Sequence, residues 1–531
     1  MDVACREEPA VSERFRVTYA TLSADNEDLH KAYEAGADQA RGWLGRRLAP
    51  VVDGETRPGA APVDLISPSD TTLRLATVAG ATDADVADAV AAARTAFPAW
   101  SATPWRERIA ILRRAADLIS ERSNELAALM TMEVGKNRLE ALGDVEESAD
   151  LIRYYCDAYD ENEGFDRPMA TIAPRESTRS VLKPHGVWAV ISPFNFPMAL
   201  AAGPAGAALA AGNTVLLKPS LQGTFSATEL FTCLVDAGLP RGVAHLLPGG
   251  DETGRALVAH DGVDGLTFTG SYETGMAVIR AFTRAYPRPV IAEMGGKNAT
   301  IVSARADLDR AVAGVARSAF GLSGQKCSAC SRVYVARELH DEFVAALAER
   351  ADSLVVGDPL DRDTYVGPVI DADAVQRYRD AVAHAATAGR VVTGGRVLAG
   401  VDGRPDGHYL APTVVADVPP GDELFSRELF VPLVAVASVD SIDEGIDRAN
   451  ASPLGLTAGF FSTDDAEVAR FLDRIQAGVV YVNRPAGATT GAWPGVQPFG
   501  GWKGSGSTGK AGGGPYYVQQ YLREQSQTVV S

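Results

Sequence analysis

Four short apolar segments in the middle of the chain recur at nearly constant spacing. Each is followed by a turn containing glycine or proline and then by a helical pattern; the segments are Val187–Ser192, Thr214–Leu217, Ala244–Leu247 and Leu266–Thr269. Their last residues are 25, 30 and 22 positions apart. This spacing is typical of βαβ units, because two neighbouring parallel strands must be joined by a crossover of a dozen or more residues. We therefore predict a parallel, doubly wound sheet of the α/β class.

A second alternating series of strands and helices begins after residue 298, which we interpret as a second α/β domain. Its strand candidates are Ala299–Val302, Arg332–Val335, Val391–Thr393, Phe430–Val439, Thr457–Phe461 and Gly478–Val482. The predicted order is a helical extension (1–59, with a helix from Asp28 to Leu48), a first domain (60–293), a second domain (294–495) and a chain return with a tail strand (496–531).

Charge, apolar pattern and cysteine usage narrow the possible partners. The 531 residues include 50 Lys+Arg against 68 Asp+Glu, a net charge of −18, which disfavours a general nucleic-acid binder. No run of 18 apolar residues occurs, so we expect no membrane span. The acidic N-terminus lacks the pattern of a secretory signal, and five cysteines in a long chain imply no disulfide framework. We expect a cytoplasmic protein.

The segment Gly324–Cys330 places Cys327 after a glycine turn. A cysteine that opens a helix there would receive backbone N–H groups, which stabilise both a thiolate and an oxyanion. A buried structural thiol or a regulatory Cys-x-x-Cys pair is the alternative. A single such pair without nearby histidines does not indicate zinc, and we expect no metal site.

Three further segments follow predicted strands, where active sites of open α/β sheets gather. Glu293 ends an apolar strand (Val290–Ala292) and could serve as a general base if burial raises its pKa, or else cap a turn. Asn195, between two prolines, could donate to an oxyanion or simply form the turn. Gly270 and Ser271 lie between a strand and a helix start, where backbone N–H groups could face a pyrophosphate.

Together and in this order, these segments resemble the aldehyde dehydrogenase superfamily, from about residue 60 to the C-terminus. The separation of 34 residues between Glu293 and Cys327 is similar to the family's pattern, as is the order of the motif residues Asn195, Lys218, Gly270, Glu293, Cys327 and Glu428. Only eight residues are lysines, and four of them (Lys218, Lys297, Lys326 and Lys503) fall inside the motif segments. Such retention is expected where arginine cannot replace lysine geometrically.

The resemblance implies a Rossmann-type cofactor domain, a catalytic domain and a role for each matching residue. Cys327 would attack the aldehyde to give a thiohemiacetal, the Asn195 amide and the Cys327 backbone N–H would hold the oxyanion, and Glu293 would activate water for hydrolysis of the thioester. The implied cofactor is NAD or NADP. The residues implied to bind it are Ser192, Phe194, Lys218, Gly270, Ser271, Gly275, Glu428 and Phe430.

Two positions depart from the family pattern. Leu221 stands where NAD-preferring members usually carry a carboxylate that would repel a 2′-phosphate, so NADP remains permitted. Val431 replaces the usual glycine after Phe430, which changes the local turn. Two strand candidates, Ser177–Leu182 and Tyr517–Leu522, resemble the strands of the family's oligomerisation flap, to which residues 177–186 would contribute. We therefore expect a homo-oligomer, a dimer or a larger assembly.

The amino-acid sequences of three segments resemble those of the 1-pyrroline-5-carboxylate dehydrogenases, a branch of this family. The segments are Gly324–Arg332, Gln497–Pro515 and Met132–Tyr155. That branch oxidises glutamate γ-semialdehyde to glutamate in proline catabolism. The resemblance implies that Ser328 and the backbone N–H groups of Gly512 and Gly513 anchor the substrate carboxylate. The full set of implied substrate-binding residues is Phe196, Ser328, Phe499, Gly512 and Gly513.

Three other functions remain open at this point. The Gly-rich loop could be a flexible connection, in which case the substrate is another aliphatic or aromatic aldehyde. A CoA-acylating dehydrogenase has the same fold, although retention of Glu293 as a water-activating base disfavours it. A non-catalytic dinucleotide-binding or redox-sensing protein could use Cys327 and Cys330 as a thiol pair.

Overall fold

The computed structural model describes residues 25–400, 406–485 and 493–531. The first 24 residues of the predicted N-terminal extension, including Cys5, lie outside the described residues. The same holds for residues 486–492 near the end of the predicted second domain. The domain boundaries at 59/60, 293/294 and 495/496 stay predictions.

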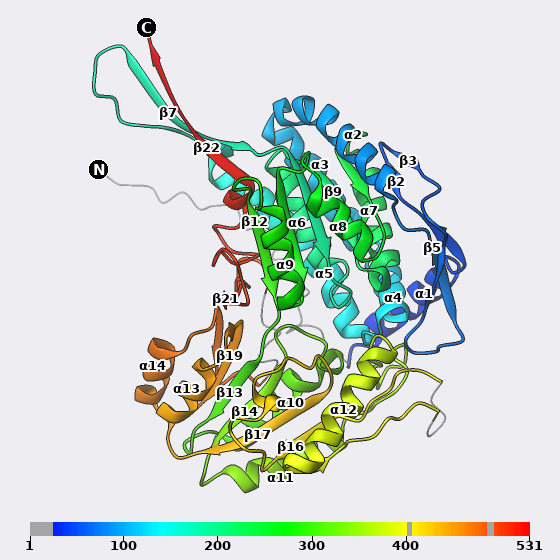
Figure 1. Ribbon diagram of the computed structural model, residues 1–531, viewed down its shortest axis with the longest axis vertical. Helices are drawn as coiled ribbons and strands as arrows, with labels where there is room; N and C mark the ends of the chain where they lie inside the picture. Colours follow the sequence, from blue (N-terminus) through cyan, green and yellow to red (C-terminus); the bar gives the residue numbers. More distant parts are fainter. Residues whose placement is uncertain (1–24, 401–405, 486–492) are drawn as a thin grey trace, which may run out of the picture.

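The first of two large sheets has seven strands in the order β12-β11-β8-β9-β10-β2-β3 (Figure 1). Its five parallel strands include all four that the spacing predicts; the full set is β8 (Val187–Ser192), β9 (Thr214–Pro219), β10 (Ala244–Leu246), β11 (Gly265–Gly270) and β12 (Val290–Met294). β2 (Val51–Val52) and β3 (Glu55–Thr56) add an antiparallel edge. Every residue of β8 and β9 is buried, as an apolar parallel strand covered on both faces requires.

Helices cover both faces of this sheet. Trp188 and Val190 pack on one face beneath α3 (Trp105–Glu121), α4 (Ser123–Val134), α5 (Arg138–Glu161), α6 (Ala199–Ala210) and α7 (Thr224–Asp236). Val187 and Ala189 pack on the other face beneath α2 (Asp83–Ala102), α8 (Asp251–Ala259) and α9 (Tyr272–Phe282). Because successive strand residues point to opposite faces, this alternation is the doubly wound arrangement that the sequence predicts.

The second large sheet has the order β15-β16-β17-β14-β13-β19-β20. Its strands are β13 (Asn298–Val302), β14 (Cys330–Ala336), β15 (Arg390–Thr393), β16 (Thr413–Ala416), β17 (Leu433–Val439), β19 (Thr457–Phe461) and β20 (Val479–Val482). Its helices are α10 (Leu308–Phe320), α11 (His340–Asp352), α12 (Ala372–Ala388), α13 (Ile442–Asn450) and α14 (Asp465–Arg474). β16 was not predicted, and β17 begins three residues later than the predicted Phe430 start.

Side chains at the helix starts satisfy backbone N–H groups that have no partner within the helix. Thr82 and Asp85 form a reciprocal capping box at α2, and Asn137 accepts the N–H of Glu140 at α5. Single acidic or hydroxyl caps begin α10, α12, α13 and α14, from Asp307, Asp371, Ser441 and Asp464. These local signals explain why the helices begin where the sequence pattern changes.

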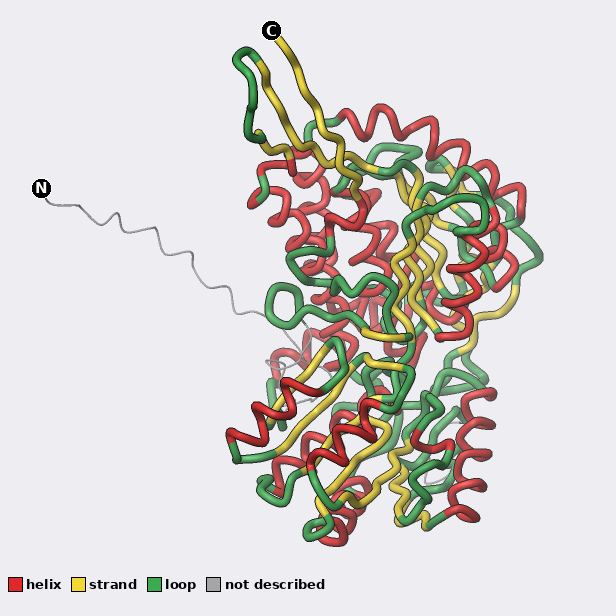
Figure 2. The backbone as a smooth tube through the Cα atoms, turned by 60° about the vertical axis from the view of Figure 1, so that its left-hand side comes forward, coloured by secondary structure: helices red, strands yellow, loops and turns green. Residues whose placement is uncertain are grey.

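Three smaller sheets connect and extend the body. β7 (Glu176–Pro184) pairs with β22 (Leu522–Val530) over nine residues and with β6 (Asp166–Pro168), and this arm projects from the body in both views (Figures 1 and 2). The expected strand Tyr517–Leu522 is wrong: Val518–Tyr521 forms a 3-10 turn and the strand follows it. The other two sheets contain β1 (Arg46–Leu48), β4 (Val63–Ile66) and β5 (Arg74–Val78), and β18 (Leu454–Gly455) with β21 (Trp502–Lys503).

The predicted N-terminal helix is shorter than expected. α1 (Glu27–Arg41) ends seven residues before Leu48, because the chain turns there to form β1, which pairs in parallel with β5. Five 3-10 turns complete the described elements: Glu163–Phe165, Leu221–Gly223, Gly321–Gly324, Glu423–Phe425 and Val518–Tyr521. Within the described ranges, no helix is both long and apolar enough to cross a bilayer.

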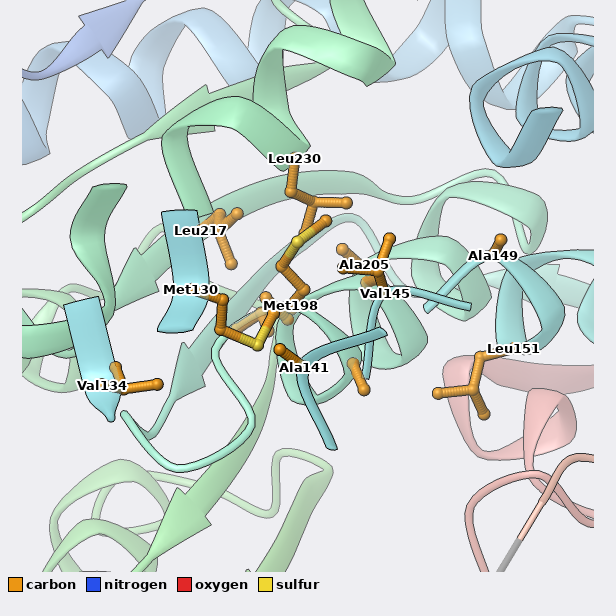
Figure 3. Packing of buried hydrophobic residues seen from close by; sticks show 14 of the residues in the cluster. Met130, Val134, Ala141, Val145, Ala149, Leu151, Met198, Ala205, Leu217 and Leu230 are labelled. Atoms are coloured by element: carbon orange, nitrogen blue, oxygen red, sulfur yellow. The ribbon is translucent and has the colours of Figure 1, made fainter. Parts of the chain in front are cut away.

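Apolar side chains from four helices and one strand meet in the largest core (Figure 3). Met130 and Val134 of α4, Ala141 and Val145 of α5 and Met198 just before α6 belong to this core, and Met130 lies next to Met198 and Ala141 in Figure 3. Lys136 and Asp144 are both fully buried next to this core, and their charged atoms are 2.6 Å apart. Asp144 also accepts the Ala199 N–H, so each carboxylate oxygen has a partner.

We predict that Lys136→Met destabilises the protein by about 3–5 kcal/mol, because it leaves the Asp144 carboxylate buried without its cation. Urea unfolding followed by circular dichroism measures the change. Arg41→Met is the matched control, because the Arg41–Asp38 pair is exposed and should contribute less than about 1 kcal/mol. Equal stability losses in the two variants would contradict the prediction.

Candidate active site

A cavity of about 1110 Å³ lies at the carboxyl-terminal ends of β8, β9, β11 and β12. The turn that carries Cys327, the segment Ser426–Phe430 and residues 493–499 close it from the other side. Open α/β sheets place ligands at this edge, so the position agrees with the expectation from the strand ends.

Nearly all the residues predicted for the site line this one cavity. They are Ser192, Phe194, Asn195, Phe196, Lys218, Gly270, Ser271, Glu293, Cys327, Ser328, Glu428, Phe430, Phe499, Gly512 and Gly513. Gly275 does not line it. A Cβ at position 275 would collide with the Met294 side chain, so this glycine lets α9 pack closely against β12. This packing is the role that the structure shows for Gly275, and its contact with a cofactor stays a prediction.

Cys327 lies on a turn between the 3-10 turn Gly321–Gly324 and β14, and it does not open a helix. Burial, together with the nearby carboxylates of Glu428 and Glu293, raises the pKa of its thiol to about 12. The backbone N–H groups of Ser328 and Cys327 act in the opposite direction. The thiol is therefore protonated at neutral pH in this state, and a base must remove its proton before it attacks.

Asn195 is buried in the loop between β8 and α6 and faces the cysteine turn. Its amide nitrogen donates to the Gln325 carbonyl at 2.9 Å, two residues before Cys327. An amide nitrogen carries two N–H groups, so one remains for a ligand after this bond is made. This hydrogen bond also links the loop that carries Asn195 to the turn that carries Cys327.

The chain crosses from one large sheet to the other within three residues, Gly295 to Lys297, between β12 and β13. A Cβ at Gly295 would collide with the Glu428 carboxylate, and one at Gly296 with the Cys327 carbonyl. Both glycines are therefore needed for the close approach of these groups. The crossover brings Glu293, Glu428 and Cys327 to the same point.

Glu293 is held at the end of β12 by the glycine-rich return of the chain. Its carboxylate accepts the Gly501 N–H at 3.0 Å, and the neighbouring Met294 N–H donates to the Ser505 carbonyl. Burial raises the pKa of Glu293 to about 8, against the smaller effect of the Gly501 N–H. A carboxyl group with this pKa can exchange protons near neutral pH, as a general base requires.

Glu428 accepts the Gly296 N–H at 2.9 Å, and burial raises its pKa to about 7. Lys297 follows on the crossover, and burial lowers its pKa to about 7. The Lys297 ammonium nitrogen has no hydrogen-bond partner among the described residues. Of these two groups, the Glu428 carboxylate acts on the Cys327 thiol, and the Lys297 ammonium acts on Glu428.

The first-domain side of the cavity offers polar groups without protein partners. The hydroxyl of Ser192 is buried and makes no hydrogen bond within the described part of the chain. Burial lowers the pKa of Lys218 to about 8, and its ammonium group makes no hydrogen bond to the described residues. Orphaned donors at the end of parallel strands fit the ribose and phosphates of a dinucleotide.

Ser271 caps α9 and is partly engaged: its hydroxyl accepts the Thr274 N–H at 3.2 Å. The first turn of this eleven-residue helix faces the cavity. Across from it, the rings of Phe194 and Phe430 meet edge to face at 6.1 Å. Phe430 takes the left-handed conformation (φ 59°) and Val431 does not, so position 431 needs no glycine, and both Glu428 and Phe430 line the cavity.

The glycines expected to anchor a substrate carboxylate line the cavity, and their backbone N–H groups bond to protein acceptors. The Gly512 N–H donates to the Phe499 carbonyl, and the Gly513 N–H donates to the Tyr155 hydroxyl at 2.9 Å. An anion bound here would have to share or replace these acceptors, and the anchoring role of the two glycines stays a prediction. Ser328 is buried and lines the cavity, as do the rings of Phe196 and Phe499.

Sequence reasoning missed the aromatic wall of this region. Tyr155 of α5 stacks on Tyr517 with ring centroids 5.2 Å apart, and both line the cavity. Arg377 and Trp493 also line it without having been predicted. No local motif surrounds these residues, so only the fold reveals them. Among the described residues, no group of three or more His, Cys, Asp or Glu side chains could hold a metal ion.

Residues 56–527 match the model of the aldehyde dehydrogenase family, and the chain belongs to this family. The cavity lies between the two sheets, and a cysteine, an asparagine and a glutamate converge on it. It is the candidate active site of this family member.

Among curated relatives, the chain is 36% identical over 505 residues to "1-pyrroline-5-carboxylate dehydrogenase" of Geobacillus sp. (strain WCH70), covering 94% of this chain and 96% of the relative. It is 35% identical over 501 residues to "1-pyrroline-5-carboxylate dehydrogenase 2" of Bacillus subtilis (strain 168), covering 92% and 93%. A solved structure of 1-pyrroline-5-carboxylate dehydrogenase from Thermus with bound NAD superposes with a TM-score of 0.90, at 32% identity and 100% coverage of both chains.

We predict that iodoacetamide modifies Cys327 before Cys156, Cys233 and Cys330, because those three are buried and Cys327 is partly exposed to the cavity. Glu428→Gln should speed this reaction at pH 7 by up to about tenfold, since each unit of thiol pKa changes the thiolate fraction tenfold. Peptide mapping by mass spectrometry gives the rates. In urea the four cysteines should react alike, and earlier labelling of Cys330 in the folded protein would contradict the assignment.

Proposed function

We propose that this chain oxidises L-glutamate 5-semialdehyde, the open-chain form of 1-pyrroline-5-carboxylate, to L-glutamate, a step of proline catabolism, with NAD or NADP as hydride acceptor. The observation that supports this most is that Cys327, Asn195 and Glu293 line one cavity in a chain whose full-length relatives carry the 1-pyrroline-5-carboxylate dehydrogenase name. An aldehyde dehydrogenase requires these three kinds of group around one carbonyl carbon.

In the proposed reaction, the Cys327 thiol loses its proton to solvent and its sulfur bonds to the aldehyde carbon. The carbonyl oxygen becomes an oxyanion, which the Asn195 amide and the Cys327 backbone N–H stabilise. The oxidised nicotinamide, when bound, accepts the hydride that leaves this carbon. A thioester on Cys327 remains; Glu293 then removes a proton from water, the water oxygen bonds to the thioester carbon, and the C–S bond breaks to release the carboxylate.

We assign the dinucleotide to the first-domain side of the cavity. Ser192 and Lys218, whose polar groups lack protein partners, would bind its hydroxyl and phosphate oxygens, and the α9 start at Gly270 and Ser271 would face the pyrophosphate. Glu428, Phe430 and Phe194 would position the nicotinamide end. Leu221 lines the cavity without a carboxylate, which leaves room for NADP as well as NAD.

We assign the semialdehyde to the region between Phe196 and Phe499. The two rings would enclose the aliphatic chain, and the Ser328 hydroxyl would donate to the substrate carboxylate. Gly512 and Gly513 would shape this end through their backbone, whose N–H groups bond to protein acceptors.

Two further parts of the proposal concern the assembly and the compartment. The β7–β22 arm presents the exposed side chains of Met169, Val529 and Val530, which supports pairing with another copy of the chain. The four cysteines of the described chain are free thiols, which supports a reducing compartment such as the cytoplasm.

We predict that the steady-state rate rises with pH through about 8. Glu293 has a pKa raised to about 8, so its ionised, base-competent form appears only as pH passes that value. Glu293→Gln should remove this dependence and lower kcat by about 10²-fold or more, while one equivalent of reduced cofactor still forms in a burst. Stopped-flow absorbance at 340 nm measures both phases.

Cys327→Ala is the matched control, because it should abolish the burst as well as the steady state. A Glu293→Gln enzyme with the wild-type steady-state rate would refute the role of Glu293 as the water-activating base.

We predict that kcat/KM for glutamate semialdehyde exceeds that for pentanal and benzaldehyde, with each aldehyde measured against NAD and against NADP. Ser328→Ala should lower kcat/KM for the semialdehyde about 10- to 100-fold more than for pentanal, because only the semialdehyde offers a carboxylate to the hydroxyl. Reduced-cofactor formation in initial-rate assays gives the comparison.

The same assays distinguish the other functions. Equal kcat/KM values for all three aldehydes would overturn the substrate assignment but leave an aldehyde dehydrogenase. A rate that depends on added CoA would indicate the acylating reaction. Dinucleotide binding without turnover of any aldehyde would indicate the non-catalytic function.

A further inference from the structure

Helix α5 carries two carboxylates, Glu140 and Asp144, one helical turn apart. Residues four apart on a helix lie on the same face, so the two groups point in the same direction. Each contacts a different loop of the reaction centre: Asp144 the loop that holds Asn195, and Glu140 the turn that holds Cys327. Neither carboxylate lines the cavity.

Asp144 holds the loop that carries Asn195 through both of its own carboxylate oxygens. One oxygen accepts the N–H of Ala199, the first residue of α6, at 2.8 Å. The other binds the Lys136 ammonium, whose nitrogen lies 3.5 Å from the ring centroid of Phe196. Phe196 directly follows Asn195, so the contact holds the residue next to the oxyanion donor from behind.

The Glu140 side fixes the cysteine turn in the same two-point manner. One carboxylate oxygen accepts the Leu322 N–H at 3.0 Å, and the other binds the Lys326 ammonium at 2.6 Å. Leu322 and Ser323 both have left-handed backbone conformations, with φ of 48° and 54°. Such a pair of non-glycine residues persists only where the surroundings hold it in place, and Lys326 directly precedes Cys327.

The two loops also touch each other, through the bond from the Asn195 amide to the Gln325 carbonyl. The Gln325 side chain is anchored in turn, because its amide oxygen accepts the Ile370 N–H at 2.9 Å. The distance between the Asn195 amide and the Cys327 sulfur is therefore set by one rigid helix behind both loops and one hydrogen bond between them.

We propose that Glu140 and Asp144 are positioning residues, which together form a clamp on α5 that holds the oxyanion donor Asn195 in register with the nucleophile Cys327. This inference rests on the proposed function of the same site. Each carboxylate is matched by one lysine, so the clamp adds no net charge to the reaction centre and acts through geometry. A misplacement of about 1 Å between reacting groups can reduce a rate about 10²-fold.

The test uses Glu140→Gln in the full chain, because this side chain keeps the acceptor for Leu322 and loses the charged contact with Lys326. We expect the rate of the first burst of reduced cofactor to fall by at least about tenfold, with KM for the aldehyde changed less than about twofold. Lys326→Met breaks the same contact from the other side and should give the same fall.

The matched control is Glu146→Gln on the same helix. Glu146 accepts from the Ser120 hydroxyl at 2.9 Å and contacts neither loop, so the burst rate should not change. Thermal unfolding and NAD binding, measured on every variant, separate loss of folding from loss of alignment.

A double-mutant cycle with Asn195→Ala tests whether Glu140 acts by aligning the Asn195 amide with Cys327. If the clamp acts by registering Asn195 with Cys327, Glu140→Gln should lower the burst rate by less than about threefold once the amide is gone. Equal fold losses with and without Asn195, or a burst rate unchanged in both clamp variants, would overturn the clamp. An inactive wild-type enzyme with every aldehyde would instead refute the proposed function.

Discussion

The three-residue crossover between β12 and β13 is the constraint on which the rest of the structure depends. β12, an edge strand of the first sheet, ends at Met294, and β13, an interior strand of the second, begins at Asn298, so the carboxyl end of one strand lies next to the amino end of the other. Gly295 and Gly296 have no side chains, and the space they leave is filled by the Glu428 carboxylate and the Cys327 carbonyl. The cavity forms there because the strand ends that carry polar groups cannot move apart.

The sequence predicted the parallel strands well because they are short, apolar and buried on both faces. It failed where tertiary contacts decide the backbone. Phe430 was expected in a strand, but its left-handed conformation delays β17 to Leu433. Tyr517–Leu522 was expected to extend, but Tyr521 is pulled into the core against Trp188, with ring centroids 4.6 Å apart, and the strand begins only after it.

In the candidate site, too, some residues could be predicted from the sequence and others depend on tertiary contacts. Cys327, Asn195 and Glu293 follow strands or glycine turns, so their clustering could be anticipated from position alone. The hydrogen bonds of the glycine loop could not be judged in this way, because the N–H groups of Gly512 and Gly513 meet Phe499 and Tyr155 only in the folded chain. Tyr155 lines the cavity and Glu140 contacts the turn of Cys327, both from a helix more than 100 residues before that cysteine, and the spacing within one motif does not reveal such contacts.

The arm of β7 and β22 determines how the protein can be handled. Ser531 bonds to Arg175 at the far end of this arm, which projects from the body in Figure 1. A purification tag or a fused partner attached there would leave the path of substrate and dinucleotide open. It would, however, crowd the exposed side chains of Val529 and Val530, the surface proposed above for pairing with another copy.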